Sequence, residues 1–418
     1  MPDPVETSPL TRLSGGLLPL LDAAMPGNIT AVLRRFLVEH AGASDAGILL
    51  ADYELSQLRR LSPRPGETEK VPVTGSIEGQ CFVAQSLLVD PGRTGRTALD
   101  RPGGPAGGAA GADETLVLVP LSLRAERLGV LQVAFQGPVS AGLLRGLQEV
   151  ALATTYTLVV CGSFSDVVEV TRRAEPLTLA AEMQWNLQPL RAFSAPGFSV
   201  AGQLIPSYEV GGDTYDYDVA ADHLDLSSLD AMGHGLGASV LAALATAVMR
   251  NTRRGGGGPA EQVTRADRAL LAHFGGAQFV TVLAMRLGLR SGVLELVNAG
   301  HPAPWLIRDG RAAQVTLDPR LPAGMFEATD YVVEHLQLQA GDRLVVVTDG
   351  VLEAGAPGEE LGEDRLAGLL LASADLTPHQ CVAEVLHTVR AYAPRLHDDA
   401  TVVCLDWDGP SGSSVVTG

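Results

Sequence analysis

Hydrophobic and polar residues follow two different periods along this chain. A helical period runs from near Leu20, just after Pro19, to about Val38. Apolar runs of strand length follow in AGILLADYELSQLRRLS, VPVTGSIEGQCFVAQSLLVDP and TLVLVPLSLRAERLGVLQVAF. We expect the second segment to hold a short helix between two strands. The third predicts a hairpin that turns at Arg124 to Arg127, with Gly129 opening its second strand.

A second helical region is predicted from Ala141 to about Leu190. Before it, the Gly/Ala/Pro stretch RPGGPAGGAAGADE lacks side chains that pack a core, so we expect a mobile loop there. The helices suit a signalling stalk or dimer seam, and equally well they suit caps on two flanking domains. Their apolar spacing is too brief to predict a coiled coil, so a homodimer is a hypothesis.

Strands dominate again from Phe198 onward. The apolar run Ala238 to Met249 predicts a buried helix, RRGGGGP a flexible break, and Ala260 to about His273 another helix. Three strands are expected in FVTVLAMRL, GVLELVNAG and APWLIRDG, and a last helix near Gln380 to Tyr392. Short strands flanked by helices favour an antiparallel sandwich in an α+β protein.

Composition limits the classes of protein that this chain can belong to. With 418 residues, 46% of them hydrophobic, and a mean hydropathy of +0.17, it can bury large cores in two or three globular domains. No apolar run approaches the roughly 20 residues of a membrane span, and the acidic start MPDPVETSPL is unlike a signal peptide. We therefore expect a cytoplasmic protein.

Charge and cysteine content narrow the partners. The formal net charge of −18 argues against nucleic acid or an anionic membrane, because an acidic surface repels both. Proteins are the expected partners. Four widely spaced cysteines form no metal or disulfide pattern, which agrees with a reducing compartment, and Cys81 and Cys161 are interpreted as core residues.

Four separate acidic positions next to turns or strand ends carry the candidate chemistry. Asp213 follows Gly211 and Gly212, glycines that we expect to turn the backbone through positive φ. The other three positions are Asp230 before AMGHG, Asp349 before Gly350, and the pair Asp398 and Asp399 before an apolar strand. A single Asp beside Gly is usually only a turn. Four together, without a His or Cys cluster, favour Mg²⁺ or Mn²⁺.

An ordered series of motifs in the last half of the chain carries a resemblance. The motifs are EVGGDTYD, DAMGHG, FVTVLAMRL, NAGHPAP, LPAGM, GDRLVVVTDGVLEA and DDAT. The series resembles the SpoIIE/RsbU branch of the metal-dependent (type 2C, PPM) serine/threonine protein phosphatases. This resemblance implies an αββα sandwich with two Mn²⁺ or Mg²⁺ ions at one edge. About residues 25–160 are similar to a GAF sensor domain, through SIEGQCFVAQ and the VPL and GVLQV strands.

The resemblance implies a role for each acidic residue. Asp213 and Asp230 would be metal ligands, the latter with the backbone carbonyl of Ala231, and Asp349 and Asp398 would complete the second metal's shell. Asp399, Asp216 and Glu209 are expected beside these ligands. A metal-activated water would attack phosphorus, so no protein nucleophile is required. His234 and His301 lie in motif loops, where each either supports the leaving oxygen or is structural. The GGD block contains no phosphate-gripping arginine.

Other enzyme classes fit the motifs less well. A diguanylate cyclase needs an acidic residue where Thr214 stands, and a haloacid-dehalogenase signature fails at Ala220. A cysteine phosphatase needs an arginine six residues after its cysteine, and none of the four cysteines has one.

The sequence therefore predicts five segments. They are a flexible tail (1–18), a GAF-like α/β sensor domain (19–160), a helical linker (161–195), a SpoIIE-type phosphatase domain (196–408) and a second flexible tail (409–418). The expected function is dephosphorylation of a STAS-domain anti-anti-sigma factor in bacterial partner switching, under control of an effector of the GAF-like domain. The alternative is a non-catalytic sensor or scaffold whose phosphatase fold only docks a partner.

Overall fold

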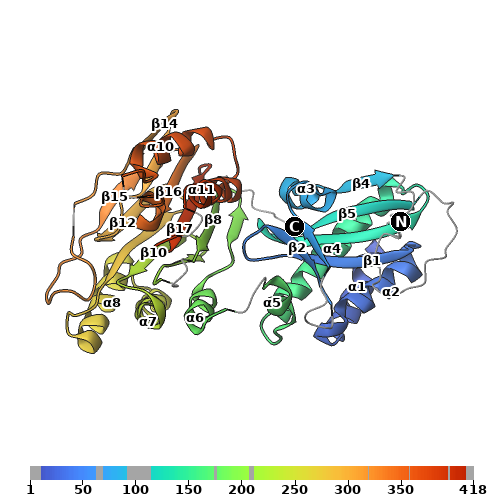
Figure 1. Ribbon diagram of the computed structural model, residues 1–418, viewed down its shortest axis with the longest axis horizontal. Helices are drawn as coiled ribbons and strands as arrows, with labels where there is room; N and C mark the ends of the chain where they lie inside the picture. Colours follow the sequence, from blue (N-terminus) through green and yellow to red (C-terminus); the bar gives the residue numbers. More distant parts are fainter. Residues whose placement is uncertain are drawn as a thin grey trace, which may run out of the picture. The chain divides into compact units, whose positions relative to one another are not determined.

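The computed structural model consists of two compact units, Met1–Pro176 and Leu177–Gly418, shown in Figure 1. The structure describes residues 11–62, 69–91, 114–173, 177–206, 211–318, 320–356, 358–393 and 396–410. The expected Gly/Ala/Pro loop lies almost wholly outside these ranges, as do residues 1–10 and 411–418 of the two expected tails.

The first unit is built on one antiparallel sheet of six strands in the order β3-β2-β1-β6-β5-β4. The strands are β1 (Asp45–Ala51), β2 (Gln57–Arg60), β3 (Lys70–Pro72), β4 (Leu88–Pro91), β5 (Glu114–Leu123) and β6 (Glu126–Gln136). The helices are α1 (Thr11–Asp22), the 3₁₀ turn η1 (Pro26–Asn28), α2 (Ile29–Ala41), α3 (Ile77–Ala84), α4 (Ala141–Cys161) and α5 (Val167–Arg172). The expected hairpin is β5 and β6, and Gly129 lies inside β6 rather than at its start.

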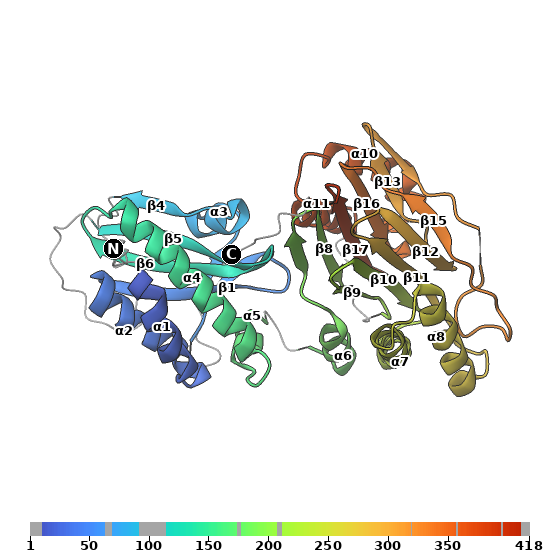
Figure 2. The same cartoon turned by 180° about the vertical axis from the view of Figure 1, so that it is seen from behind.

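Alternating side chains of this sheet contribute to two cores. One face, with Ile48 and Leu131, packs under α1, α2 and α4, while the other, with Leu49 and Val130, packs under α3. Figure 2 shows α1 and α4 side by side over the first of these faces.

Helix α1 begins earlier than the pattern predicted. It starts at Thr11 and continues through Pro19, so residues 11–18 are helix rather than tail. Leu17 and Leu21 are one turn apart and both buried, which supplies the packing that holds this turn despite the proline. Burial of Leu17 and Leu21 therefore stabilises the helix more than Pro19 destabilises it.

The second unit contains two antiparallel sheets. The five-stranded sheet has the order β15-β12-β11-β10-β9, and the six-stranded sheet β14-β13-β16-β17-β8-β7. The strands are β7 (Ala192–Ala195), β8 (Phe198–Ile205), β9 (Thr214–Val219), β10 (His223–Ala231), β11 (Val280–Gly288), β12 (Val293–Ala299), β13 (Trp305–Arg308), β14 (Arg311–Gln314), β15 (Glu334–Gln337), β16 (Asp342–Val347) and β17 (Ala400–Trp407). The helices are α6 (Leu179–Leu187), α7 (Gly235–Arg254), α8 (Pro259–Phe274), α9 (Asp349–Leu352), α10 (Gly362–Ala372) and α11 (Pro378–Tyr392).

Three apolar layers hold this unit together. Leu226, Leu283 and Val346 belong to the core between the two sheets. Helices α7 and α8 cover the five-stranded sheet, and α10 and α11 cover the six-stranded one. The α+β class and the αββα sandwich expected from the sequence are confirmed. The turn between β12 and β13 carries the chain from one sheet to the other.

The three helices that connect the sheet of the first unit to the sheets of the second belong to different units. Helices α4 and α5 pack in the first unit, whereas α6 packs against α7 in the second. The boundary after Pro176 falls inside the stretch expected to be a linker. Across the described ranges, no helix combines the length and hydropathy that a bilayer crossing requires. All four cysteines are buried and unbridged.

Candidate metal centre

Aspartates from both sheets of the second unit meet at one end of the sandwich. Asp213 directly precedes β9, and Asp230 is the last residue but one of β10, its antiparallel neighbour. In the other sheet, Asp349 follows β16 after Thr348, and Asp398 and Asp399 precede β17. In antiparallel neighbours, the start of one strand and the end of the other lie at the same end of the sheet. The topology therefore collects carboxylates that are distant in sequence.

Two threonine hydroxyls hold the buried carboxylate of Asp213. Thr348 Oγ1 and Thr401 Oγ1 both donate to Asp213 Oδ2, at 2.6 and 2.7 Å. Thr348 follows β16 and Thr401 lies in β17, both in the six-stranded sheet, whereas Asp213 precedes β9 of the five-stranded sheet. The two hydrogen bonds therefore connect the sheets at this end of the sandwich. The hydrogen bonds leave Oδ1 of Asp213 outside this pair of contacts.

Asp399 and Gln184 complete a buried polar network. Asp399 is fully buried, and its Oδ1 accepts from the amide of Gly211 at 2.9 Å. The side-chain amide of Gln184, on α6, donates to the carbonyl of Asp213 at 2.9 Å and to Asp399 Oδ2. One side chain of α6 thus contacts both a candidate ligand and its neighbour.

The glycines of the GGD block serve close approach rather than positive φ. Neither Gly211 nor Gly212 is among the residues with positive φ, which corrects the expected reason for their presence. A Cβ on Gly211 would lie 2.9 Å from Asp398 Oδ1 and from Asp399 Oδ2. A Cβ on Gly212 would lie 2.6 Å from the carbonyl oxygen of Ala231. Glycine keeps a space open directly beside the carboxylates.

Burial and mutual repulsion raise the pKa values of the clustered carboxyls. Burial, followed by the charges of Asp349 and Asp398, raises the pKa of Asp230 to about 7. Burial raises the pKa of Asp398 to about 6, with a further contribution from Asp349. Burial and then Asp230 raise the pKa of Asp213 well above its usual range. These shifts mark a site that lacks compensating positive charge.

The residues present fit a hard divalent cation in kind and in place. Carboxylate oxygens are the ligands that Mg²⁺ and Mn²⁺ prefer, and the buried Oδ1 of Asp349 has no hydrogen-bond partner. Within the described ranges, however, no three acidic, His or Cys side chains are grouped tightly enough to enclose one ion. The orphaned oxygen of Asp349 and the raised pKa values of Asp230 and Asp398 nevertheless fit a cation at this end of the sandwich.

Asp216 lies on the opposite face of the sheet. Its register partner is Ser227, on the helix-facing side of β10, whereas Asp230 points between the sheets. Arg250 binds its two oxygens at 2.8 and 3.0 Å, and Arg253 binds Oδ2 at 2.8 Å. Asp216 therefore fastens α7 to β9 and does not join the cluster. Glu209 lies outside the described residues.

The two motif histidines occupy different environments. His234 is exposed, in the position before α7. His301 is buried, and its Nδ1 lies 3.0 Å from Thr281 Oγ1, while Nε2 has no partner. Burial lowers the pKa of His301 to about 3, so its ring is neutral at physiological pH. Thr281 pairs with Asp230 across β11 and β10. His301 is therefore separated from the carboxylate cluster by Thr281.

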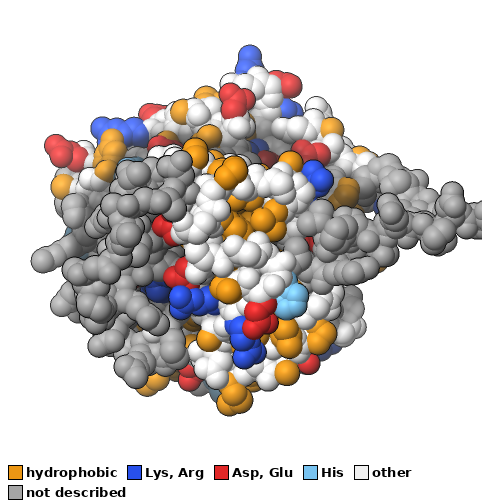
Figure 3. Space-filling model, turned by 90° about the vertical axis from the view of Figure 1, so that its right-hand side faces the viewer, with side chains coloured by type: hydrophobic (Ala, Val, Ile, Leu, Met, Phe, Trp, Pro, Cys, Tyr) orange, Lys and Arg blue, Asp and Glu red, His pale blue; other side chains and the backbone are white. Residues whose placement is uncertain are grey.

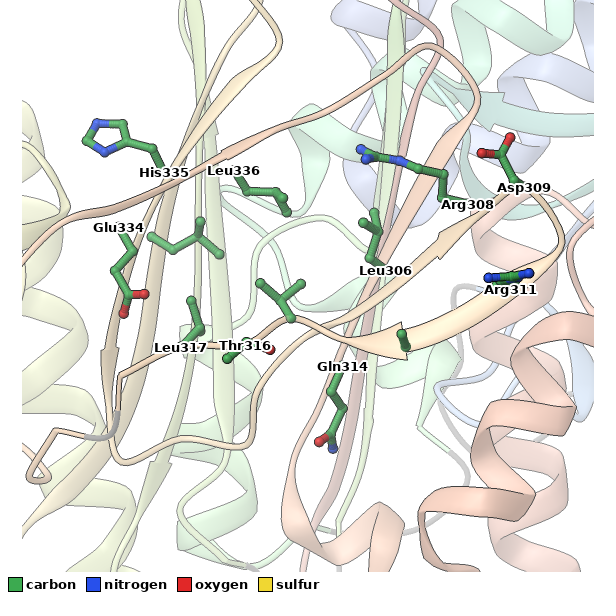
Figure 4. A pocket seen from close by; sticks show the side chains of 13 residues that line it. Leu306, Arg308, Asp309, Arg311, Gln314, Thr316, Leu317, Glu334, His335 and Leu336 are labelled. Carbon is green, nitrogen blue, oxygen red and sulfur yellow. The ribbon is translucent and has the colours of Figure 1, made fainter.

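A cavity of about 690 Å³ lies apart from the carboxylates. Figure 4 shows it between the β13–β14 hairpin and β15, with Leu306, Leu317 and Leu336 on its walls and Arg311 and Glu334 at its rim. None of the candidate ligands lines it. On the face that Figure 3 shows, acidic and basic side chains are intermixed among the coloured atoms.

Sequence patterns did not reveal three residues of the site. Thr348 and Thr401 sit in apolar strand-like runs, where a threonine is an ordinary strand residue. Gln184 lies in a helix whose sequence carries no motif. The only available signal was the position of Thr348 and Thr401 next to or near the acidic residues of their motifs.

The second unit is an αββα sandwich that gathers carboxylates at one end, the architecture that the resemblance implied. Residues 220–408 match the family model of Stage II sporulation protein E (SpoIIE), a range that includes Asp230, Asp349 and Asp398 but not Asp213. This match confirms that the second unit carries a SpoIIE/RsbU-type domain.

Two proteins of known name are similar to part of this chain. Over 156 residues the chain is 28% identical to the phosphoserine phosphatase RsbP of Bacillus subtilis, covering 36% of this chain and 38% of RsbP. Over 222 residues it is 24% identical to protein IcfG of Synechocystis sp., covering 46% of this chain and 35% of IcfG. The chain thus spans well under half the length of these relatives.

Solved structures of similar fold include two bacterial proteins. The RsbU and RsbW domains of Rv1364c from Mycobacterium tuberculosis align with a TM-score of 0.47 and 24% identity, over 52% of this chain and 62% of that one. The SiaA-PP2C domain of Pseudomonas aeruginosa aligns with a TM-score of 0.46 and 23% identity, over 50% and 86%.

Proposed function

We propose that this chain is a metal-dependent phosphatase that removes phosphate from serine or threonine of a protein. The observation that carries the proposal is the convergence of Asp213, Asp230, Asp349 and Asp398 at one end of the sandwich, with raised pKa values and an orphaned carboxylate oxygen on Asp349. The RsbP similarity supports the same reaction class.

Two Mn²⁺ or Mg²⁺ ions fit this proposal. Asp213, Asp230 and the carbonyl of Ala231 would hold one, and Asp349 and Asp398 the other. When bound, such ions neutralise phosphate charge and lower the pKa of water, which then serves as the nucleophile. The chain's own residues orient the ligands: Thr348 and Thr401 fix one oxygen of Asp213, and Gly211 keeps the space beside Asp398 free of a side chain.

The proposed substrate is a phosphorylated STAS-domain anti-anti-sigma factor, within a bacterial partner-switching pathway. The similarity to the phosphoserine phosphatase RsbP supports a phosphoserine substrate, and the STAS domain is what the resemblance to the SpoIIE/RsbU branch implies. We further propose that the first unit is a GAF-like sensor whose effector, a small molecule or a protein, controls the second unit. Its six-stranded antiparallel sheet with helices on both faces supports a sensor of this kind.

The second candidate function is a non-catalytic scaffold that only docks a partner. The absence of a ready three-ligand group among the described residues favours it. The two candidates differ in one measurement, phosphate release from phosphorylated STAS-domain proteins and from p-nitrophenyl phosphate, with and without Mn²⁺. Release that depends on Mn²⁺ and stops with EDTA is expected. Binding of the phosphoprotein without any release would identify a scaffold, and release that survives EDTA would exclude the metal mechanism.

A further inference from the structure

The cavity between the β13–β14 hairpin and β15, which we call the edge cavity, is a gap in the core between the two sheets (Figure 4). Its borders include β14 and β15, which are edge strands of only four residues each. Leu296 in its wall is buried, whereas Leu306 and Leu336 belong to the same core but are only partly buried. Protein interiors are close-packed, so a cavity of about 690 Å³ that continues an apolar core is available for a ligand.

Strand β14 points a small side chain toward the edge cavity. Ala312 packs in the core beneath α10, so its neighbours Arg311 and Ala313 face the other way, toward the five-stranded sheet. Both neighbours line the cavity and both are exposed. A large apolar side chain at position 313 would fill part of the gap. The alanine leaves the gap open to solvent.

One cation at the rim is not neutralised by the chain itself. Arg308 forms an ion pair with Asp342, its Nε donating at 2.8 Å, and its Nη2 donates to the carbonyl of Gln337 at 2.9 Å. Hydrogen bonding to Asp342, with a further contribution from the charge of Asp309, raises the pKa of Arg308, so both acids act on that arginine. Arg311 forms no hydrogen bond or ion pair with the residues that the structure describes. Its guanidinium is therefore available to an anion.

The remaining acid at the rim lies on the far side of the edge cavity. Figure 4 shows Glu334 and Arg311 at opposite sides, and Glu334 Oε1 accepts a hydrogen bond from the amide of Asp318 at 3.0 Å. The apolar walls are aliphatic, and none of the described residues that line the cavity is Phe, Tyr or Trp. Walls of this kind suit a flexible aliphatic chain rather than a flat ring, against which aromatic side chains would stack. The guanidinium at one side suits a single negative charge at one end of that chain.

We propose that the edge cavity binds a medium-chain fatty carboxylate, with its carboxylate against Arg311 and its chain along the aliphatic walls. The cavity volume lies within the roughly 300 to 1,000 Å³ of small-molecule sites. Pairing of guanidinium with carboxylate orients the head group, and burial of the chain supplies most of the affinity. None of the candidate metal ligands lines the cavity, so this site is distinct from the metal centre.

Isothermal titration calorimetry of the full chain with decanoate tests the proposal. We expect a dissociation constant below about 1 mM, an affinity that the burial of about five CH₂ groups supplies. Affinity should rise by up to about 4-fold for each CH₂ added from hexanoate to decanoate. Decyltrimethylammonium, which has the same chain and a cationic head group, should bind at least about 10-fold more weakly. No binding at about 5 mM decanoate, or equal binding of the anion and the cation, overturns the proposal.

Two pairs of matched variants place the ligand, all at exposed positions where the wild-type Tm should be kept. Arg311→Gln should weaken decanoate binding by roughly 10-fold, the loss of one charge-assisted hydrogen bond, and Arg268→Gln on α8 is its control. Ala313→Trp should weaken decanoate binding by at least about 10-fold, because the indole occupies the edge cavity. Ala221→Trp, in the turn between β9 and β10, is the second control. Wild-type affinity in both Arg311→Gln and Ala313→Trp overturns the proposal.

A photoreactive decanoate locates the site without any substitution. With a diazirine at the end of its chain, irradiation should label residues between 306 and 317, between 334 and 336, or Leu296, the parts of the chain that line the edge cavity. Mass spectrometry of proteolytic peptides identifies the labelled segment, and excess decanoate should prevent the labelling. Label found only outside these segments overturns the proposal. None of these measurements uses phosphatase activity or a metal ion, so their outcome is independent of the proposed function.

Discussion

At Asp213 a buried carboxylate is held by two hydroxyls and not by a cation. Thr348 and Thr401 each satisfy the same oxygen, which fixes the side chain but supplies no positive charge. Other aspartates surround it, and this raises its pKa well above the usual range. Such an arrangement is unfavourable for a folded protein on its own. A divalent cation is the simplest compensation, and it accounts for both the burial and the repulsion.

Removing one candidate ligand should abolish turnover. We expect Asp230→Asn or Asp349→Asn to lower phosphate release by at least about 100-fold, because a metal-dependent site loses an anionic ligand while the side-chain shape is kept. The change is measured as kcat/KM on a phosphoprotein and on p-nitrophenyl phosphate. The combined Cys81→Ser, Cys161→Ser, Cys381→Ser and Cys404→Ser variant, if folded, should keep its activity, since no cysteine lies in the cluster. Near-normal turnover in Asp349→Asn would contradict the assignment.

The pH dependence of stability should show the raised pKa of Asp230. Its folded pKa of about 7 lies above the ordinary value of 3.8, so the folded metal-free protein binds more protons than the unfolded chain between these values. Stability contributed by this group is full below about pH 4 and is lost as pH rises toward 7 and above. In EDTA, Tm should fall between pH 5.5 and 8 by at least about 3 °C, the shift that about 1 kcal/mol produces in a domain of this size.

Two comparisons isolate this effect from other titrating groups. The Asp230→Asn variant should lose less Tm than the wild type over the same pH range, because its amide does not ionise. Adding Mn²⁺ at pH 8 should restore Tm in the wild type and much less in the variant. A wild-type Tm in EDTA that rises from pH 5.5 to 8 in step with the variant would show that the carboxylate is not destabilising.

Gly211 should be intolerant of a methyl group. Gly211→Ala places a Cβ 2.9 Å from oxygens of Asp398 and Asp399, so these carboxylates must move. We expect the Mn²⁺ concentration for half-maximal activity to rise by roughly 10-fold, as for other disturbances next to a ligand. Gly237→Ala is the control, because a Cβ there meets nothing within 4 Å in α7. Equal Mn²⁺ titrations of the two variants would show that the space beside Asp398 is not needed.

The aspartates could be predicted from the sequence, and the residues that hold them could not. Asp213, Asp230, Asp349 and Asp398 stand in distinctive Asp and Gly contexts that the structure brings to one end of the sandwich. Asp216 was expected beside the ligands, but its place two residues into a strand turns it toward Arg250 and Arg253. Side-chain direction depends on register, and spacing from a glycine pair does not give register.

At the scale of elements, α6 is the helix most directly tied to the site. Gln184 contacts Asp213 and Asp399, Gln188 donates to Thr214 Oγ1 at 3.3 Å, and Arg250 donates to the carbonyl of Leu187 at 2.6 Å. A shift of α6 would therefore be felt on both sides of the carboxylate cluster. These contacts give α6 a direct physical route to Asp213.

Gln184 should set the metal requirement without touching the reacting atoms. Gln184→Ala removes hydrogen bonds to Asp213 and Asp399, so the ligands lose part of their orientation. We expect the half-maximal Mn²⁺ concentration to rise by about 10-fold, within the range that partners of metal ligands show, with little change in kcat at saturating Mn²⁺. Asn186→Ala, on the exposed side of the same helix, should behave as wild type. A kcat loss that saturating Mn²⁺ does not recover would argue for a different role.

The boundaries of helices and strands could be predicted where the apolar pattern is long. They could not be predicted where tertiary packing determines the structure of a short segment. Helices α7, α8 and α11 follow clear apolar periods. The four-residue strands β14 and β15 were not expected, because they are edge strands whose polar sequences carry almost no alternation. Helix α10 was missed as well. The predicted start near Leu20 was wrong, because burial of Leu17 and Leu21 holds the turn before Pro19 in α1.

At the scale of the whole molecule, each hydrophobic core is formed by residues of one unit only. The three large cores of the second unit draw on residues from Leu187 onward, and the two cores of the first unit end at Val168. Each unit can therefore retain its packing when the other changes. The proposed control of the second unit by the first would therefore act as a shift between populations of the second unit and not through a shared core.

Removing the first unit tests this control. Deleting residues 1–176 leaves the cores of the second unit and α6 intact, so a folded, active protein is expected. If the first unit sets the fraction of chains whose carboxylates are correctly placed, turnover or the Mn²⁺ requirement should change, because misplacement by about 1 Å costs on the order of 100-fold in rate. A Gly-Pro insertion beside Glu169 breaks α5, whose Val168 is buried in the first unit's core, so it should remove the response to an effector while the second unit keeps its packing. Mn²⁺ titrations of the full chain, the deletion and the insertion decide the matter. Superimposable curves, also with candidate effectors present, would mean that the first unit only tethers or localises the enzyme.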